Sequence, residues 1–349
     1  MTIDFVGNHY TFGRVPMGWH SFDDALKGDD DLVGFPTRTF SEFYGMTGIG
    51  KSTLIGSILS KVSQALEHRE IACLALEMQD EKMVSNVLSS SGYRAKFVWV
   101  EPPIVSGKLD DSDEALLGVL LEHIHDEPYR LGWLDSIASI SPISENEGNL
   151  GDANMGRRAF PMAQFSRRVT RALRNVPEDS CLIAANHWYE KMGAIGMAKQ
   201  YTSPGGVVKE NEEHLRIQLK VPWVDYISSG DGKAEARWET GWVLEGKVEK
   251  NRAGAKNKRF QVFIYGGWGV HMGMTAVIDC LASGLAKIKS GKIVMDDYEF
   301  GNLKKIIERE RDNTEFFIPF INKLREGIDT VLSEDDGVVE ETPKKKRGK

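Results

Sequence analysis

Gly45-Met46-Thr47-Gly48-Ile49-Gly50-Lys51-Ser52 is the stretch of this 349-residue chain that decides the fold. It fits the pattern G-x-x-x-x-G-K-[ST] in full, a glycine-rich loop whose backbone N–H groups surround phosphates. β-rich residues precede it at 38–44, and a helix is predicted from Lys51 to about Leu66 because apolar residues recur on one face. The motif therefore lies at a strand-to-helix junction, and this placement predicts a nucleotide site.

Three side chains around this loop are candidates for the chemistry. Lys51 is expected to reach the β- and γ-phosphates, while Ser52, followed by Thr53 in the same binding stretch, offers a hydroxyl to Mg²⁺. Asp135 ends a predicted strand at 130–135 and is the natural partner for the metal, although an Asp that only caps the next turn would look the same. Glu77 ends a buried strand at 71–77, at the sheet edge where ligands bind, and could deprotonate the attacking water. Its alternative role is to cap the following helix.

Strands and helices alternate through the first half of the chain. Strands are predicted at 38–44, 71–77, 97–100 and 130–135, with helices between them, a pattern typical of an α/β fold with a mostly parallel sheet covered on both faces. Further strands are predicted at 181–186, 214–220, 242–249 and 259–265. We expect a short N-terminal segment (1–35), a core (36–272), a small C-terminal α/β module (273–331) and a disordered acidic-then-basic tail (332–349).

Composition excludes several classes of protein. Hydrophobic residues make up 41% and charged residues 27%, and no apolar run approaches the roughly 18–20 residues that span a bilayer. Cys73, Cys181 and Cys280 are widely spaced in apolar contexts, so we expect reduced core residues and not a disulfide framework. The net charge of −7 argues against a protein coated in positive charge, but it does not exclude a local basic surface.

Such a basic surface is predicted between Asp152 and Glu178, where six arginines occur without an acidic residue. In 162–176 the apolar residues form one helical stripe, and Arg167, Arg171 and Arg174 lie on another side. A solvated charged face is the ordinary interpretation of such arginines. The lack of acids instead favours contact with phosphates.

The stretch SPISENEGNLGDANMG at 141–156 resembles the first DNA-binding loop of bacterial RecA. Other resemblances to this family follow in the same order. VPMGWHSFDDAL (15–26) is similar to the segment before the nucleotide site, Asn186-His187 to the sensor that ends a strand, TSPGG (202–206) to the close of the second DNA-binding loop, and KVEKNR (247–252) to a basic strand. The resemblance covers about residues 15–270, and the family's N-terminal packing helix has no match in the printed sequence.

This resemblance implies a RecA-like P-loop core that forms a filament on single-stranded DNA, binds Mg-ATP between subunits, and pairs that strand with a homologous duplex. Carried over by position, Lys51 and Ser52 bind phosphate and Mg²⁺, Glu77 activates water, and Asp135 supports the metal. His187 would sense the γ-phosphate. The resemblance also implies that Lys250 and Arg252 reach the ATP of the neighbouring subunit and that Tyr265 lies near the adenine.

The DNA-binding candidates come from the same resemblance and from residue chemistry. The family match indicates Arg158 and Arg167, with Arg157 close by and Arg171 on the same helix. Met155 and Met192 correspond to loop positions that wedge between bases, and each is followed by a glycine, Gly156 and Gly193. Gly205 and Gly206 close the second loop. Trp188 and Tyr189 are either base-stacking platforms or buried aromatics.

Two other functions remain open. Residues 76–92 also resemble a hexameric replicative helicase, but the 145–156 loop is foreign to helicases. A recombination mediator that uses ATP only structurally is the third alternative, and the set of Lys51, Glu77 and Asp135 argues against it. The prediction is an ATP-dependent recombinase with single-stranded-DNA-dependent ATPase activity, located in the cytoplasm at the nucleoid, or in the host cytoplasm if the Asn-His pair indicates a phage source.

Overall fold

The computed structural model describes residues 13–29, 32–66, 70–77, 84, 95–125, 130–143, 159–176, 180–190, 201–221, 237–238, 241–265, 268–302, 306 and 314–335. Its central feature is a sheet with the strand order β16-β15-β14-β12-β3-β9-β8-β4-β5, to which β13 adds beside β14. The bounds of these strands are β3 Thr39–Gly45, β4 Ile71–Ala75, β5 Phe97–Trp99, β8 Leu131–Asp135, β9 Cys181–His187, β12 Leu215–Lys220, β13 Arg237–Trp238, β14 Gly241–Asn251, β15 Arg259–Tyr265 and β16 Gly269–Val270.

Parallel pairing runs from β12 through β3, β9, β8 and β4 to β5, whereas β14, β15 and β16 continue the sheet in antiparallel fashion. The carboxyl ends of parallel strands meet at one edge. Gly45 pairs with His187 and Ala75 with Asp135, so the ends of four strands bring the predicted site residues to the same edge. The predicted α/β fold with a mostly parallel sheet is confirmed.

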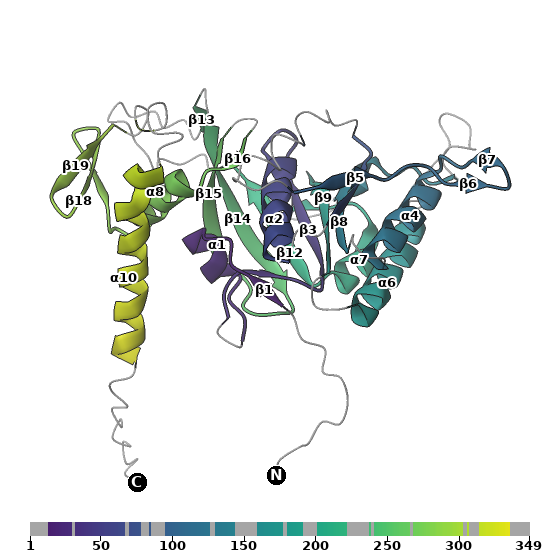
Figure 1. Ribbon diagram of the computed structural model, residues 1–349, viewed down its shortest axis with the longest axis horizontal. Coiled ribbons are helices and arrows are strands. Elements are labelled where there is room, and N and C mark those ends of the chain that lie inside the picture. Colours follow the sequence, from purple (N-terminus) through teal and green to yellow (C-terminus); the bar gives the residue numbers. More distant parts are fainter. Residues whose placement is uncertain are drawn as a thin grey trace, which may run out of the picture.

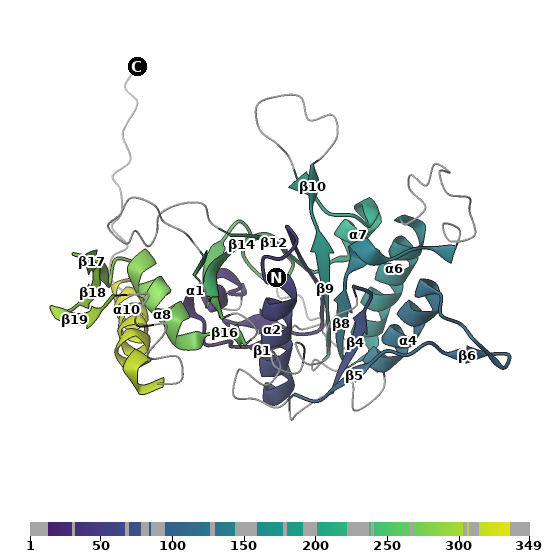
Figure 2. The ribbon, with the colours of Figure 1, turned by 90° about the horizontal axis from the view of Figure 1, so that it is seen from above.

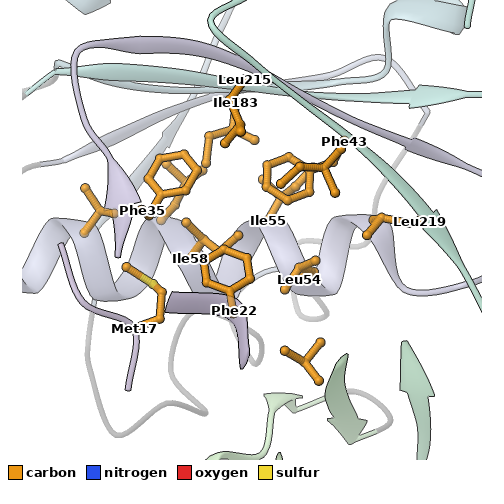
Figure 3. Packing of buried hydrophobic residues seen from close by; sticks show 14 of the residues in the cluster. Met17, Phe22, Phe35, Phe43, Leu54, Ile55, Ile58, Ile183, Leu215 and Leu219 are labelled. Carbon is orange, nitrogen blue, oxygen red and sulfur yellow. The ribbon is translucent and has the colours of Figure 1, made fainter. Parts of the chain in front are cut away.

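Helices cover both faces of this sheet (Figures 1 and 2). One face carries α1 (His20–Ala25) and α2 (Lys51–Ala65), and the other carries α4 (Asp113–His125), α6 (Ala159–Asn175) and α7 (Gly206–Glu212). Neighbouring strand residues point to opposite faces: Ile183 joins the apolar cluster under α2, whereas Leu182 joins the cluster under α4 and α6. Figure 3 shows part of the first cluster: in this view Phe43 lies above α2 beside the sheet, Phe22 lies below the helix, and Ile58 projects from the helix itself.

The interrupted strand before Asp135 has a packing reason. A Cβ at Gly132 would lie 2.7 Å from Leu182 Cδ1 and 3.2 Å from Ile124 Cδ1, so a larger residue at this position would displace both side chains. Arg130 precedes β8 with a φ of 65° and is not part of the strand. Gly132 therefore interrupts the apolar run of β8 because its neighbours pack closely at this position, and the strand itself is continuous.

The C-terminal module combines helices with a small sheet. Its elements are α8 (Met272–Ala282), β17 (Lys287–Lys289), β18 (Lys292–Met295), β19 (Tyr298–Gly301), a 3-10 turn (Thr314–Phe317) and α10 (Ile318–Asp335). A third apolar cluster joins α8 and α10 to Val243 and Phe263 of the main sheet. The segment boundaries at 35, 272 and 331 stay predictions; α10 continues past residue 331, and residues 336–349 lie outside the described part.

The remaining elements are short. They are β1 (Arg14–Val15) paired with β2 (Phe35–Pro36), a β6–β7 hairpin (Ile104–Val105, Lys108–Leu109), a 3-10 turn (Ile137–Ser139), and β10 (Tyr189–Glu190) paired with β11 (Tyr201–Thr202). All three cysteines are free and buried, as predicted. Among the described residues, no helix combines the length and apolar character needed to cross a membrane.

Asp279 of α8 links the C-terminal module to α1, because its Oδ2 accepts a 3.0 Å hydrogen bond from the Ser21 backbone N–H. Burial raises the pKa of Asp279 to about 6, from an ordinary value of 3.8, against the opposing effect of the Ser21 hydrogen bonds. The folded protein therefore holds this proton to a higher pH than the unfolded chain. The stability that this proton provides is complete below about pH 4 and is lost as the pH rises through about 6.

We expect Asp279→Asn, which stays neutral and keeps an acceptor for Ser21, to unfold with a free energy about 2–3 kcal/mol above that of the wild type at pH 8. At pH 4 the two proteins should be nearly equal in stability. Urea unfolding at both pH values measures this difference. An offset that is the same at pH 4 and pH 8 would contradict the assignment.

Candidate functional site

The glycine-rich loop connects β3 to α2 at the carboxyl edge of the sheet. Gly48 and Gly50 have φ angles of 72° and 98°, a left-handed conformation that glycine adopts without steric cost. Gly50 caps α2, so the N-terminal end of this helix, with its free N–H groups, faces the loop. The loop therefore has the backbone form of a phosphate-binding site.

Lys51 lies in the first turn of α2 and is 6% exposed. Its Nζ donates to the carbonyl oxygens of Met46 at 2.8 Å and of Gly45 at 3.3 Å. Burial lowers the pKa of Lys51, and the charges of Asp135 and Glu77 oppose that effect. The ammonium is thus held inside the loop, beside both predicted carboxylates.

Ser52 and Asp135 form the candidate metal position. The Ser52 Oγ donates to Asp135 Oδ2 at 2.6 Å, and Asp135 itself is buried. A hydroxyl and a carboxylate are oxygen ligands of the kind that Mg²⁺ prefers, with waters and phosphate oxygens completing its shell. No group of three His, Cys, Asp or Glu side chains suited to a metal occurs in the part of the chain that the structure describes. This donor set fits a cation brought in with a nucleotide.

The predicted strand 71–77 ends at Ala75, so Glu77 lies in the turn two residues after β4. The neighbouring Leu76 N–H donates to the Asp135 carbonyl at 2.7 Å. Glu77 Oε1 accepts hydrogen bonds from Ser136 Oγ and from Ser139 Oγ, the latter at 3.1 Å. Burial raises the pKa of Glu77, but the hydrogen bonds from Ser136 and His187 outweigh it and hold this pKa below its usual value. A carboxylate in this setting is ionised at neutral pH, as a general base must be.

His187 joins Glu77 to the loop. Its Nε2 lies 2.8 Å from Glu77 Oε1, and its Nδ1 lies 3.3 Å from Thr47 Oγ1 and 3.4 Å from Lys51 Nζ. An ammonium can only donate, so Nδ1 accepts, and Nε2 carries the proton that is donated to Glu77. One tautomer thus satisfies all of these contacts.

The other predicted nucleotide residues are placed as follows. Ile49 is buried, Met46 is about half exposed, and Thr53 is half-buried on α2. Tyr265 is half-buried at the end of β15, where it pairs with Gly241. Its role beside an adenine stays a prediction.

Lys250 and Arg252 lie away from this chain's own phosphate loop. In the register of the sheet, Lys250 of β14 lies opposite Arg216 of β12, and Arg216 lies opposite Glu42 of β3. Glu42 is three residues before the phosphate loop begins. The Lys250 Nζ donates to the carbonyl oxygens of Glu210 at 2.6 Å and Asn211 at 2.9 Å, and Arg252 also donates to Asn211. Within one chain these cations bind the end of α7, and a role at the neighbouring subunit's nucleotide stays a prediction.

The DNA-binding candidates are only partly described. Met155, Gly156, Arg157, Arg158, Met192 and Gly193 lie outside the described residues. Arg167 and Arg171 are exposed on α6, whose opposite side is buried as the helical stripe predicts. Gly205 and Gly206, with φ angles of 110° and 80°, open α7; a Cβ on Gly206 would lie 3.2 Å from the Cβ of Ala159 in α6. The two glycines therefore bring α7 against α6.

β9 leads into β10 (Figure 2). Aromatic side chains lie at this junction. Trp188 stacks on Tyr201 with ring centroids 4.2 Å apart and an angle of 18° between the rings. Tyr189 is 51% exposed, so it is not the buried aromatic that the sequence left possible, whereas Trp188 is half-buried. The pair therefore packs β11 against the residue that follows β9.

Comparison with known proteins finds relatives of one kind. No family model matches the chain. RecA of Treponema denticola is 25% identical over 274 residues, which cover 76% of this chain and 58% of that protein. RecA of Borrelia duttonii is 22% identical over 330 residues (93% and 83%), and RecA 1 of Myxococcus xanthus is 26% identical over 292 residues (83% and 77%). The chain is therefore similar to RecA proteins over most of its length.

The chain spans only a little more than half the length of two of these relatives. It spans 58% of the Treponema denticola RecA and 54% of the RecA of Nautilia profundicola. The crystal structure of the RadB recombinase aligns with 68% of this chain and 92% of that chain at 12% identity, with a TM-score of 0.46. That likeness is too slight to support a statement about function.

One residue of this site had no signal in the sequence. Trp242 of β14 donates from Nε1 to the Ile49 carbonyl at 2.8 Å, and its ring would lie 3.1 Å from a Cβ at Gly50. A tryptophan within a predicted strand gives no sign of such a contact. The phosphate loop is thus held from the antiparallel part of the sheet.

Proposed function

We propose that this chain, which is similar to RecA proteins, is an ATP-dependent DNA recombinase. It binds single-stranded DNA as a filament, hydrolyses ATP in a DNA-dependent manner, and catalyses homologous pairing and strand exchange at the nucleoid or in a phage-infected host cytoplasm. The observation that carries the proposal is the contact chain Lys51–His187–Glu77, because it joins the phosphate loop to the strand that leads into the 188–202 segment. Such a link is what an ATPase controlled by a bound strand requires.

In this proposal the loop 45–52 binds the phosphates through its backbone N–H groups and Lys51. Ser52 and Asp135 hold Mg²⁺, which when bound neutralises charge on the phosphate oxygens. Glu77 orients a water molecule and accepts its proton. The water oxygen forms a bond to the terminal phosphorus as the bond from that phosphorus to the bridging oxygen breaks, and ADP leaves with that oxygen.

The proposed DNA surface combines cations with aromatic rings. Arg167 and Arg171 would contact phosphates from α6, and residues 155–158, 192 and 193 would add contacts from the two loop segments. Unstacked bases would stack on the ring faces of Tyr189 and of the Trp188–Tyr201 pair. Such stacking does not depend on the DNA sequence, because every base has a flat aromatic face. Lys250 and Arg252 would reach the ATP of the adjacent subunit, so that hydrolysis follows filament assembly.

Strand exchange tests the proposed activity directly. Circular single-stranded DNA and homologous linear duplex are incubated with the protein and Mg-ATP, and joint molecules are followed on a gel. We expect joint molecules with the homologous duplex and none with a heterologous one. Unwinding of a forked duplex without homology would instead identify a helicase, and neither product despite ATP binding would identify a mediator.

Substitution of the exposed arginines tests the DNA surface. For single strands, each phosphate contact contributes about 0.7 to the slope of log affinity against log salt concentration. We expect Arg167→Ala/Arg171→Ala to reduce this slope by about 1.4 while the melting temperature is unchanged. Fluorescence anisotropy of a labelled oligonucleotide between low and moderate salt measures the slope. Arg325→Ala, an exposed arginine on α10, is the matched control; a slope reduced equally by this control would contradict the assignment.

A further inference from the structure

Trp242 of β14 contacts the phosphate loop from the antiparallel part of the sheet. Its indole Nε1 donates to the Ile49 carbonyl at 2.8 Å, and its half-buried ring packs against the apolar cluster under α2. A Cβ on Gly50 would lie 3.1 Å from Trp242 Cζ2 and 3.5 Å from Ile264 Cγ2. Trp242 and Ile264 lie directly opposite each other in β14 and β15, so the two side chains together form the surface on which Gly50 packs.

The hydrogen bond from Trp242 fixes one peptide group of the loop. A trans peptide group is planar, so the Ile49 carbonyl and the Gly50 N–H point in opposite directions. Because the carbonyl is held toward Trp242, the Gly50 N–H points away from β14. Gly50 is the N-cap of α2, and the N–H groups at this end of a helix are the ones that bind phosphate oxygens in such loops.

The glycines of the loop make this restraint necessary. Gly48 and Gly50 flank Ile49 with φ angles of 72° and 98°, and without a Cβ neither residue restricts the rotation of its peptide groups. Half a turn of the Ile49–Gly50 peptide would exchange an N–H donor for a carbonyl oxygen, which repels a phosphate. Trp242 opposes this rotation through its hydrogen bond and through the ring that lies against Gly50.

The contact made by Trp242 differs from those made by Lys51. The Lys51 ammonium donates to the carbonyl oxygens of Gly45 and Met46, and a phosphate that enters the loop competes for the same donor. The indole N–H donates to a carbonyl on the strand side and does not compete with a phosphate. Its hydrogen bond can therefore be present both before and after the nucleotide binds.

We propose that Trp242 is a positioning residue for nucleotide binding, which holds the Ile49–Gly50 peptide in the orientation that binds phosphate. Its contribution lies in affinity and not in the rate of the chemical step. Loops of this kind surround the phosphates that ATP and ADP share, so ATP, ADP and inorganic tripolyphosphate should depend on Trp242 to the same extent. This inference rests on the proposed function, because it requires that the loop bind a nucleotide.

Trp242→Phe tests the inference, because it keeps an aromatic ring against Gly50 and removes the donor. Competition with a fluorescent ATP analogue gives the dissociation constants of Mg-ATP, Mg-ADP and Mg-tripolyphosphate, and hydrolysis gives KM and kcat. We expect the three dissociation constants and KM to rise by about 3–10-fold, the effect of one hydrogen bond, with kcat within about twofold of the wild type. The melting temperature should change by no more than about 4 °C.

Trp99→Phe is the matched control. Trp99 is also a half-buried strand tryptophan, but it lies in β5 at the opposite edge of the sheet from the antiparallel strands. This variant should change none of the binding constants. Tryptophan emission adds a readout that a purely structural role would not alter: the change in emission on adding ADP should be weaker in Trp242→Phe than in the wild type, and unaltered in Trp99→Phe.

A second replacement keeps the test informative if Trp242→Phe does not fold. Benzothienylalanine at position 242 keeps the size of the bicyclic ring and has sulfur in place of the N–H, so it removes the hydrogen bond alone. It should raise the same dissociation constants by the same factor.

The inference is overturned if either replacement leaves the dissociation constants unchanged, or if kcat falls while KM stays the same. A loss of affinity for ATP and ADP with none for tripolyphosphate would also overturn it, because Trp242 would then act on the base. A wild-type protein that binds none of the three ligands would overturn the proposed nucleotide site and, with it, this inference.

Discussion

Replacing Lys51 with alanine is expected to lower the rate of ATP hydrolysis by about 10²–10³-fold, the range for losing one fixed charge at a reacting group. The Lys51 ammonium lies inside the phosphate loop, where it is shielded from water, and this burial lowers its pKa. Nucleotide affinity should fall as well. Phosphate release and binding of a fluorescent ATP analogue measure the two effects.

The same substitution should not unfold the protein. Burial of the Lys51 charge costs free energy, so its removal should leave the melting temperature unchanged or higher. Lys108→Ala, an exposed lysine of the β6–β7 hairpin, is the control for loss of a positive charge. Hydrolysis within about twofold of the wild type in Lys51→Ala would contradict the assignment of the site.

Replacing Glu77 with glutamine is expected to lower kcat by about 10²–10⁴-fold, the range for general-base catalysis, with little change in ATP affinity. The amide keeps the size of the side chain but cannot accept a proton. Single-turnover hydrolysis and analogue binding separate the two quantities. Loss of binding in parallel with kcat would assign Glu77 a structural role at the end of β4.

The pH dependence of hydrolysis gives an independent test of Glu77. Because the pKa of this carboxyl is held below its usual value, the base form is present above that pKa, and activity limited by Glu77 is lost only in acid. Ser136→Ala removes one of the hydrogen bonds that lower the pKa. We expect the acid limb of the kcat profile to move to higher pH in this variant; a limb that stays in place would show that another group controls it.

Much of the fold and the main elements of the site follow from local patterns. The phosphate loop has a fixed spacing. Asp135 and His187 each end a predicted strand, and Glu77 lies two residues after β4. Parallel pairing then brings those strand ends to one edge, as observed. The resemblance to the RecA family, predicted from the 141–156 loop and four shorter matches, is confirmed by relatives of 22–26% identity.

Other features depend on contacts between distant residues and could not be predicted. Glu42 has the appearance of a polar residue in a strand, and Lys209 lies in α7, a helix too short to give a periodic signal. Their partners are Asn186 of β9, Ser203 of the turn before α7 and Arg216 of β12, so no spacing in the sequence reveals these contacts. The same is true of Trp242, whose contact with Ile49 arises only when β14 has joined the sheet.

Electron microscopy on long circular single-stranded DNA, with a slowly hydrolysed ATP analogue, tests the central claim most directly. Head-to-tail contacts that do not close give open helices, whereas closing contacts give rings. We predict regular helical filaments that form only with the nucleotide and that are absent for Lys51→Ala. Six-membered rings, or isolated monomers on the DNA, would contradict the assignment as a filament-forming recombinase.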